Sequence, residues 1–140
     1  MSKTAVVYWS GTGNTEAMAN AVLGGMKQAG AQAQLFSAAD FDAALVPQLD
    51  AIAFGCPSMG SEELEETEFA PMFDACEAAL RGRRIALFGS YGWGDGEWMR
   101  SWESRCAELG ALLACPSVIC NNEPEEDTLS TCRALGKTLA

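Results

Sequence analysis

The residues best suited to binding chemistry lie between Ser10 and Thr15, where the sequence reads Ser-Gly-Thr-Gly-Asn-Thr. Two glycines let backbone N–H groups turn inward, and the hydroxyl and amide side chains add further donors. An apolar run precedes the loop and a helical pattern follows it, so the loop leads into a helix N-terminus, which favours an anion. The segment therefore predicts a phosphate cradle. The alternative is an ordinary strand-to-helix turn with Thr15 as its N-cap.

This cradle contains neither lysine nor arginine. A loop for nucleoside triphosphates requires a Gly-Lys-Ser/Thr sequence, and a dinucleotide fingerprint has glycine where this chain has Glu16. A small tyrosine phosphatase needs a cysteine and an arginine in the loop, and both are missing. The sequence thus favours a phosphate that serves as an anchor rather than as a reactant.

A second candidate loop covers residues 56–66 and places Met59 next to Gly60. An adaptable apolar side chain beside a residue that is free to adopt positive φ suits one face of a planar group. Glutamates occupy five of the seven positions from Glu62 to Glu68. We expect them to surround the ligand with negative charge, although acids also suit a solvated helix start.

The third candidate loop, residues 89–98, holds Trp93 between Gly92 and Gly94. A tryptophan flanked by glycines has few neighbours for a core, so it predicts an aromatic plate that stacks on a flat ligand. The alternative is an indole folded back onto its own domain. Trp98 and Trp102 are four residues apart on the next expected helix and are assigned to the core, whereas Trp9 remains ambiguous.

Strands and helices alternate along the chain. Strands are expected over residues 4–9, 33–36, 51–56, 85–90 and 112–120, and helices over 16–29, 41–46, 68–80, 97–109 and 128–139. This pattern predicts a parallel sheet with helices on both faces. Pro116 interrupts the last strand, which is therefore placed at a sheet edge. Ligands bind at the carboxyl ends of such strands, which brings the three loops together.

Composition narrows the function further. The 140 residues are expected to form one domain, 1–140, with a net charge of −10 that disfavours nucleic acid and favours basic partners. No apolar run is long enough for a membrane span, so a cytoplasmic location is expected. Histidine is absent and the six cysteines form no C-x-x-C pair, which predicts free buried thiols and no metal site.

A phosphate anchor, a Met–Gly turn and an exposed tryptophan suit a flat, monophosphorylated, redox-active ligand, and flavin mononucleotide (FMN) meets these conditions. The three motifs, at residues 10–16, 55–66 and 89–99, resemble the short-chain class of flavodoxins in order and spacing. The resemblance implies an α/β fold: a three-layer α/β/α sandwich with a five-stranded parallel sheet in the order 2-1-3-4-5. It also implies a low-potential one-electron carrier, not an enzyme, whose non-covalent FMN shuttles mainly between semiquinone and hydroquinone.

The same resemblance assigns residue roles. Ser10, Thr12, Asn14 and Thr15 hold the phosphate, Met59 packs on the inner ring face, and Trp93 stacks on the outer face. The Gly60–Ser61 peptide flips on reduction, and Glu62 hydrogen-bonds the N3 edge. The expected cofactor-binding set is Ser10, Gly11, Thr12, Gly13, Asn14, Thr15, Pro57, Ser58, Met59, Gly60, Ser61, Glu62, Ser90, Tyr91, Gly92, Trp93 and Gly94.

Two other functions were weighed against this one. A signalling receiver domain shares the sheet order but needs acids after its first strand and an aspartate at the end of its third, where this chain has Ser10 and Cys56. A specialised flavoprotein that supplies electrons or an oxidant to one enzyme stays open as an alternative. The expected partners are basic-surfaced reductases and low-potential acceptor enzymes, and the expected state is a monomer.

Overall fold

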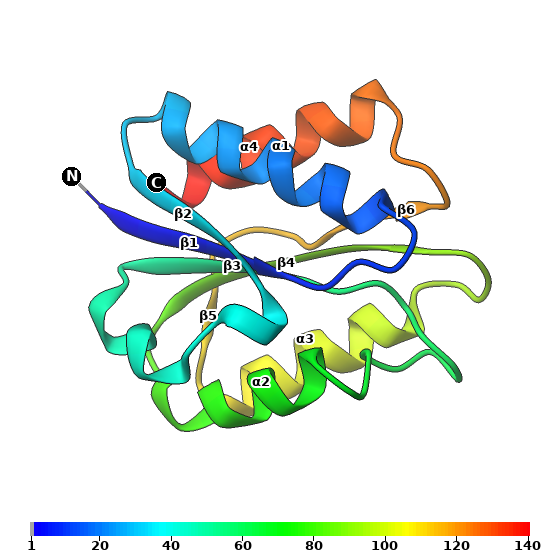
Figure 1. Cartoon of the computed structure of the whole chain (residues 1–140), viewed down its shortest axis with the longest axis horizontal. Coiled ribbons are helices and arrows are strands. Elements are labelled where there is room, and N and C mark those ends of the chain that lie inside the picture. The colour runs from blue at the N-terminus through cyan, green and yellow to red at the C-terminus, as the bar shows by residue number, and fades with distance from the viewer. Residues whose placement is uncertain (1) are drawn as a thin grey trace.

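The computed structural model describes residues 2–140 as three layers, a sheet between two pairs of helices (Figure 1). One face of the sheet is covered by α1 (Asn14–Gln28) and α4 (Glu126–Leu139). The opposite face is covered by α2 (Phe69–Cys76) and α3 (Glu97–Leu109). The expected three-layer α/β/α sandwich is confirmed.

All strand pairs in the sheet are parallel, in the order β2-β1-β3-β4-β5, with β6 also paired to β4. The expected order is therefore confirmed. The strands are β1 (Lys3–Tyr8), β2 (Gln32–Ser37), β3 (Ala51–Gly55), β4 (Arg84–Tyr91), β5 (Leu112–Leu113) and β6 (Val118–Asn121).

The single fifth strand expected over residues 112–120 is split in two, so the sheet has six strands rather than five. β5 pairs with the start of β4, and β6 pairs with its last four residues, from Phe88 to Tyr91. Pro116 lies in the gap, and because proline has no N–H it cannot donate to the ladder. Both pieces lie beside β4, at the edge where the strand was expected.

The helix expected over residues 41–46 is also different. Two 3-10 helices, Ala38–Asp40 and Ala43–Gln48, replace it, and the second contains Pro47. The Asp42 carboxylate caps this second helix by accepting from Ala44 N at 2.9 Å. The helix expected over residues 68–80 is α-helical to Cys76 and continues as the 3-10 helix Glu77–Ala79.

Successive residues of a strand point to opposite faces of the sheet and contribute to two separate hydrophobic cores, one under each pair of helices. Ala5 and Val7 pack toward α2 and α3, whereas Val6 packs toward α1 and α4. Trp98 and Trp102 are buried in the first core, as expected. Contact between α1 and α4 is so close that a Cβ at Gly25 would lie 2.0 Å from the Arg133 carbonyl oxygen.

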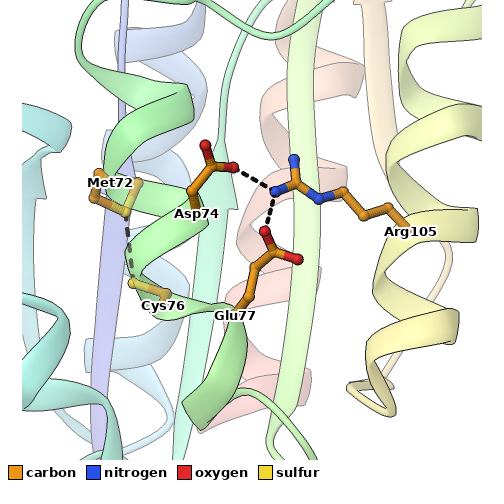
Figure 2. Close-up of polar contacts among 5 residues, drawn as sticks. All are labelled: Met72, Asp74, Cys76, Glu77 and Arg105. Atoms are coloured by element: carbon orange, nitrogen blue, oxygen red, sulfur yellow. Dashed lines mark hydrogen bonds and ion pairs between the residues drawn. The ribbon is translucent and has the colours of Figure 1, made fainter.

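Helices α2 and α3 are joined at their outer side by Arg105 (Figure 2). Its guanidinium donates to Asp74 and Glu77 and lies 4.9 Å from the centre of the Phe73 ring. This contact holds α3, which begins at Glu97, at the end of the third candidate loop. Within residues 2–140 no helix combines the length and hydrophobicity of a bilayer span.

Candidate functional site

The three loops meet at the carboxyl edge of the sheet around a cleft of about 230 Å³. Many of the residues expected from sequence line it: Ser10, Gly11, Thr12, Asn14, Thr15, Pro57, Ser58, Met59, Ser90, Tyr91 and Gly92. Six expected residues do not line this cleft: Gly13, Gly60, Ser61, Glu62, Trp93 and Gly94. The sequence therefore predicted most of the residues that line the cleft, but the six others lie outside its lining.

Ser10 organises the first loop. Its Oγ accepts hydrogen bonds from Gly13 N at 3.1 Å and from Glu16 N at 3.2 Å. Gly13 adopts φ 98°, which glycine reaches without the cost borne by other residues, and it is the N-cap of α1. The alternative in which Thr15 caps this helix is therefore wrong. Both hydrogen bonds at the start of the helix are accepted by Ser10, the first residue of the loop.

The loop presents donors that the protein itself leaves unused. Within residues 2–140 the backbone N–H groups of Gly11, Thr12, Asn14 and Thr15 have no hydrogen-bond partner. All four residues line the cleft, and the positive end of α1 adds to their field. Such unpaired N–H groups at a helix N-terminus fit a phosphate without any cationic side chain.

Thr15 also connects the first candidate loop to the third. Its side chain is buried, and its hydroxyl lies 3.1 Å from the Ser90 hydroxyl at the end of β4. The N–H of Ser90 also donates to Thr15 Oγ1 at 3.4 Å. This pair fixes the first loop against the start of the third, so that the two walls of the cleft have a set separation.

The Met59 turn is closed by a reciprocal pair of hydrogen bonds. Met59 N donates to Glu63 O and Glu63 N donates to Met59 O, each at 2.8 Å. The intervening turn uses left-handed backbone at Gly60, with φ 53°, and at Glu62, with φ 57°. Met59 lines the cleft and remains 38% exposed, which leaves its side chain available to a ligand.

Glu62 connects this turn to the third loop. Its carboxylate accepts from Glu97 N at 3.2 Å, at the start of α3. A Cβ at Gly94 would lie 2.4 Å from a Glu62 carboxylate oxygen, and Gly94 has φ 87°. A glycine is therefore required there both for space and for backbone conformation.

Trp93 stands on the rim with 64% of its surface exposed. The alternative in which this indole folds into its own domain is therefore wrong. It makes no hydrogen bond within residues 2–140, and its two neighbours in the chain, Gly92 and Gly94, carry no side chains. The indole does not line the cleft itself, but it directly follows the cleft-lining Gly92 and is open to solvent.

Two residues of the cleft were missed by sequence reasoning, Trp9 and Asn122. Asn122 adopts φ 63°, and its N–H donates to Tyr91 O at 2.8 Å. It follows β6, so the rule that selects loops at the carboxyl ends of strands also applies to it. The sequence prediction uses the loops after the first, third and fourth strands, and Asn122 lies outside all three.

Acidic side chains cluster where the Met59 turn meets the start of α3. The carboxylates of Glu62, Asp95 and Glu97 lie within 4.8 Å of one another. Arg100 hydrogen-bonds Asp95 at 2.9 Å and thereby lowers the pKa of that carboxyl, so Asp95 stays ionised. These three residues, the acidic rim, give this part of the surface a negative potential.

Buried groups near the cleft have strongly shifted pKa values. Burial raises the pKa of the Cys56 thiol to about 12, which keeps it neutral. Burial also acts to raise the pKa of Glu65, but hydrogen bonds from Thr67, Phe69 and Glu68 outweigh it and lower the pKa to about 2. Glu65 thereby caps the segment that begins α2. All six cysteines are free, as expected.

The comparisons with known proteins agree with this geometry. A family model described as Flavodoxin matches residues 6–136. The chain is 44% identical to a flavodoxin of Megasphaera elsdenii over 96% of both chains. It is 40% identical to a flavodoxin of Clostridium beijerinckii over 96% of this chain and 97% of that one.

The chain belongs to the flavodoxin family. The solution structure of two-electron reduced Megasphaera elsdenii flavodoxin superposes with a TM-score of 0.89 at 43% identity and covers 97% of both chains. Like those short-chain flavodoxins, this chain is an FMN-binding electron carrier rather than an enzyme. No finding favours the specialised activator weighed above.

The residues present fit that cofactor. FMN supplies one-electron redox chemistry when it is bound, and the protein supplies the binding site and its electrostatics. The unpaired donors of the first loop match its phosphate, and Met59 and Trp93 offer apolar surface for its ring.

Proposed function

We propose that the cleft holds FMN with its phosphate in the Ser10–Thr15 loop and its ring between Met59 and Trp93. The observation that carries this proposal is the group of four N–H donors in that loop, at the N-terminus of α1, that have no hydrogen-bond partner among residues 2–140. The other residues that line the cleft are Trp9, Pro57, Ser58, Ser90, Tyr91, Gly92 and Asn122. Gly11 and Gly13 shape the cradle, and Gly94 leaves room for Glu62.

The Met59 turn is proposed to respond to the redox state. In this proposal the Gly60–Ser61 peptide turns so that the Gly60 carbonyl accepts a hydrogen bond from the proton on flavin N5. Gly60 already has φ 53° with nothing within 4 Å of a built Cβ, so the turn has space to rearrange. Glu62, next in the turn, is the proposed acceptor for the N3 edge.

The acidic rim is proposed to set a low potential for the second electron. A carboxylate about 10 Å from the ring, at an effective dielectric constant of about 40, raises the energy of an added negative charge by roughly 0.8 kcal/mol. For one electron this corresponds to about 35 mV. Several carboxylates around the cleft therefore favour a carrier that works mainly between its half-reduced and fully reduced states.

The charge of the chain and its free thiols support proposals about its partners and its compartment. The net charge of −10 and the acidic rim favour redox partners with basic surfaces, namely reductases and low-potential acceptor enzymes. Six free cysteines favour a reducing compartment, and we propose the cytoplasm. Residues 1–140 are proposed to act as a single FMN-binding domain that works as a monomer.

The experiment is to reconstitute the apoprotein separately with FMN and with riboflavin, which lacks the phosphate. FMN is expected to bind with flavin absorption bands and at least about tenfold tighter than riboflavin, the equivalent of about 1.4 kcal/mol. Equal affinities would show that the loop does not hold the phosphate. Replacing Ser10 by alanine should remove most of the difference, because Ser10 Oγ shapes the loop.

A further inference from the structure

Trp9 separates two hollows at the carboxyl edge of the sheet. Its side chain lines the proposed FMN cleft and also a second hollow of about 410 Å³ behind the first loop. The second hollow is lined by Ser10, Gly11 and Thr12 as well, so this stretch of loop has open space on both sides. A loop with space behind it needs a support if its N–H groups are to point into the cleft.

The indole supplies that support. A Cβ at Gly11 would lie 3.0 Å from Trp9 Cη2 and 3.2 Å from Cζ3, so the ring lies against the backbone of Gly11. The backbone of Trp9 is fixed as well, because its N–H donates to Gly55 O at 3.0 Å. What remains to be fixed is the rotation of the side chain.

Glu68 fixes this rotation from another part of the chain. Its Oε1 accepts a hydrogen bond from Trp9 Nε1 at 2.9 Å. Glu68 is itself held in place, because its backbone N–H donates at 2.8 Å to the carboxylate of Glu65. A continuous series of contacts therefore runs from Glu65 through Glu68 and Trp9 to the proposed phosphate loop at Gly11.

We infer that Glu68 is a positioning residue for the phosphate of FMN, acting through Trp9 on the backbone of Gly11. This inference rests on the proposed placement of the phosphate in the Ser10–Thr15 loop. Because the phosphate and the Glu68 carboxylate are both negative, their direct interaction is repulsive. Removal of the carboxylate therefore strengthens binding if charge dominates and weakens it if positioning dominates.

The test compares FMN and riboflavin affinities of the apoprotein for Glu68→Ala and Glu68→Gln. Loss of the acceptor in Glu68→Ala is expected to weaken FMN binding about three- to tenfold, the range for one hydrogen bond. Riboflavin affinity should not change. Glu68→Gln loses the charge but keeps an amide oxygen that accepts from the indole, so it should bind FMN at least as tightly as the parent.

Two further variants separate positioning from other effects. Glu66→Ala removes a nearby exposed carboxylate that has no hydrogen bond within residues 2–140, and it should not weaken FMN binding. Trp9→Phe keeps a ring but lacks the N–H donor, so it should weaken FMN binding as Glu68→Ala does. Adding Glu68→Ala to Trp9→Phe should then cause no further loss.

The outcomes distinguish the inference from the proposal on which it rests. If the parent protein binds riboflavin as tightly as FMN, the phosphate placement itself is wrong. If the parent prefers FMN but Glu68→Ala binds it equally well or more tightly, only the positioning role is wrong. An equal loss of riboflavin and FMN affinity would also overturn it, because the effect would not be confined to the phosphate.

Discussion

The hydroxyl groups of Thr15 and Ser90 lie 3.1 Å apart in the interior, although 75 positions separate them in the sequence. One belongs to the first turn of α1 and the other to the end of β4. Through this pair the proposed phosphate loop and the loop that carries Trp93 share one buried contact. The spacing of the cleft walls is therefore a property of the folded apoprotein.

Thr15→Val is expected to lower the stability of the apoprotein by about 1–3 kcal/mol, because it leaves the buried Ser90 hydroxyl without its partner. Urea unfolding of the apoprotein measures this change. Thr12→Val is the matched control, since Thr12 makes no hydrogen bond within residues 2–140, and it should stay within about 0.5 kcal/mol of the parent. Equal free energies of unfolding for the two variants would show that the Thr15–Ser90 contact does not stabilise the fold.

Gly60→Ala should shift the first midpoint potential to more negative values. Alanine costs about 1–2 kcal/mol in left-handed backbone, which corresponds to roughly 40–90 mV for one electron. The potential shifts by this amount if the turn keeps the φ of 53° at residue 60 when FMN is reduced and leaves it when FMN is oxidised. A redox titration measures it. Gly82→Ala is the control, because Gly82 also has positive φ and open surroundings but lies between the 3-10 helix Glu77–Ala79 and β4, away from the Met59 turn. The same first potential in Gly60→Ala and the parent would contradict the peptide turn.

Trp93→Ala is expected to weaken FMN binding by about 1–3 kcal/mol, the range for one stacked aromatic contact. The stability of the apoprotein should hardly change, because the indole is 64% exposed. Fluorescence titration with FMN and urea unfolding give the two quantities. Unchanged FMN affinity would show that Trp93 does not cover the ring, and a large loss of apoprotein stability would show that it is a core residue.

Glu65 should make the apoprotein sensitive to acid. Hydrogen bonds hold its pKa in the folded state at about 2, below the ordinary value of 4.5. Its ionised form therefore stabilises the fold above about pH 4.5, and this stabilisation is lost as the pH falls from there toward 2. Urea midpoints at pH 7 and pH 3 should fall less for Glu65→Gln than for the parent. An identical fall in both proteins would exclude Glu65 as a source of this dependence.

Much of the site was readable from sequence because its chemistry is local. The order Ser-Gly-Thr-Gly-Asn-Thr between a strand and a helix specifies a cradle through backbone geometry, and helix α3 spans residues 97–109 as expected. Trp98 and Trp102 share a helix face and could be assigned to the core on that spacing.

What the sequence did not reveal depends on contacts between distant segments. Nothing near Thr15 indicates that its hydroxyl turns inward to Ser90 instead of capping α1. The assignment of Trp9 required Glu68, which is 59 positions away. Pro116 signalled an edge strand, but the pairing of both pieces with β4 is a tertiary outcome.

The most direct test of the account is to follow backbone amide resonances of isotope-labelled apoprotein as FMN is added. The largest shifts are predicted at Gly11, Thr12, Asn14 and Thr15, with further shifts around Met59, Ser90, Trp93 and Asn122. A larger hollow of about 480 Å³ lies between β6 and α4, lined by Val118 and Thr131. Shifts centred on that hollow, with the Ser10–Thr15 amides unmoved, would contradict the proposed site.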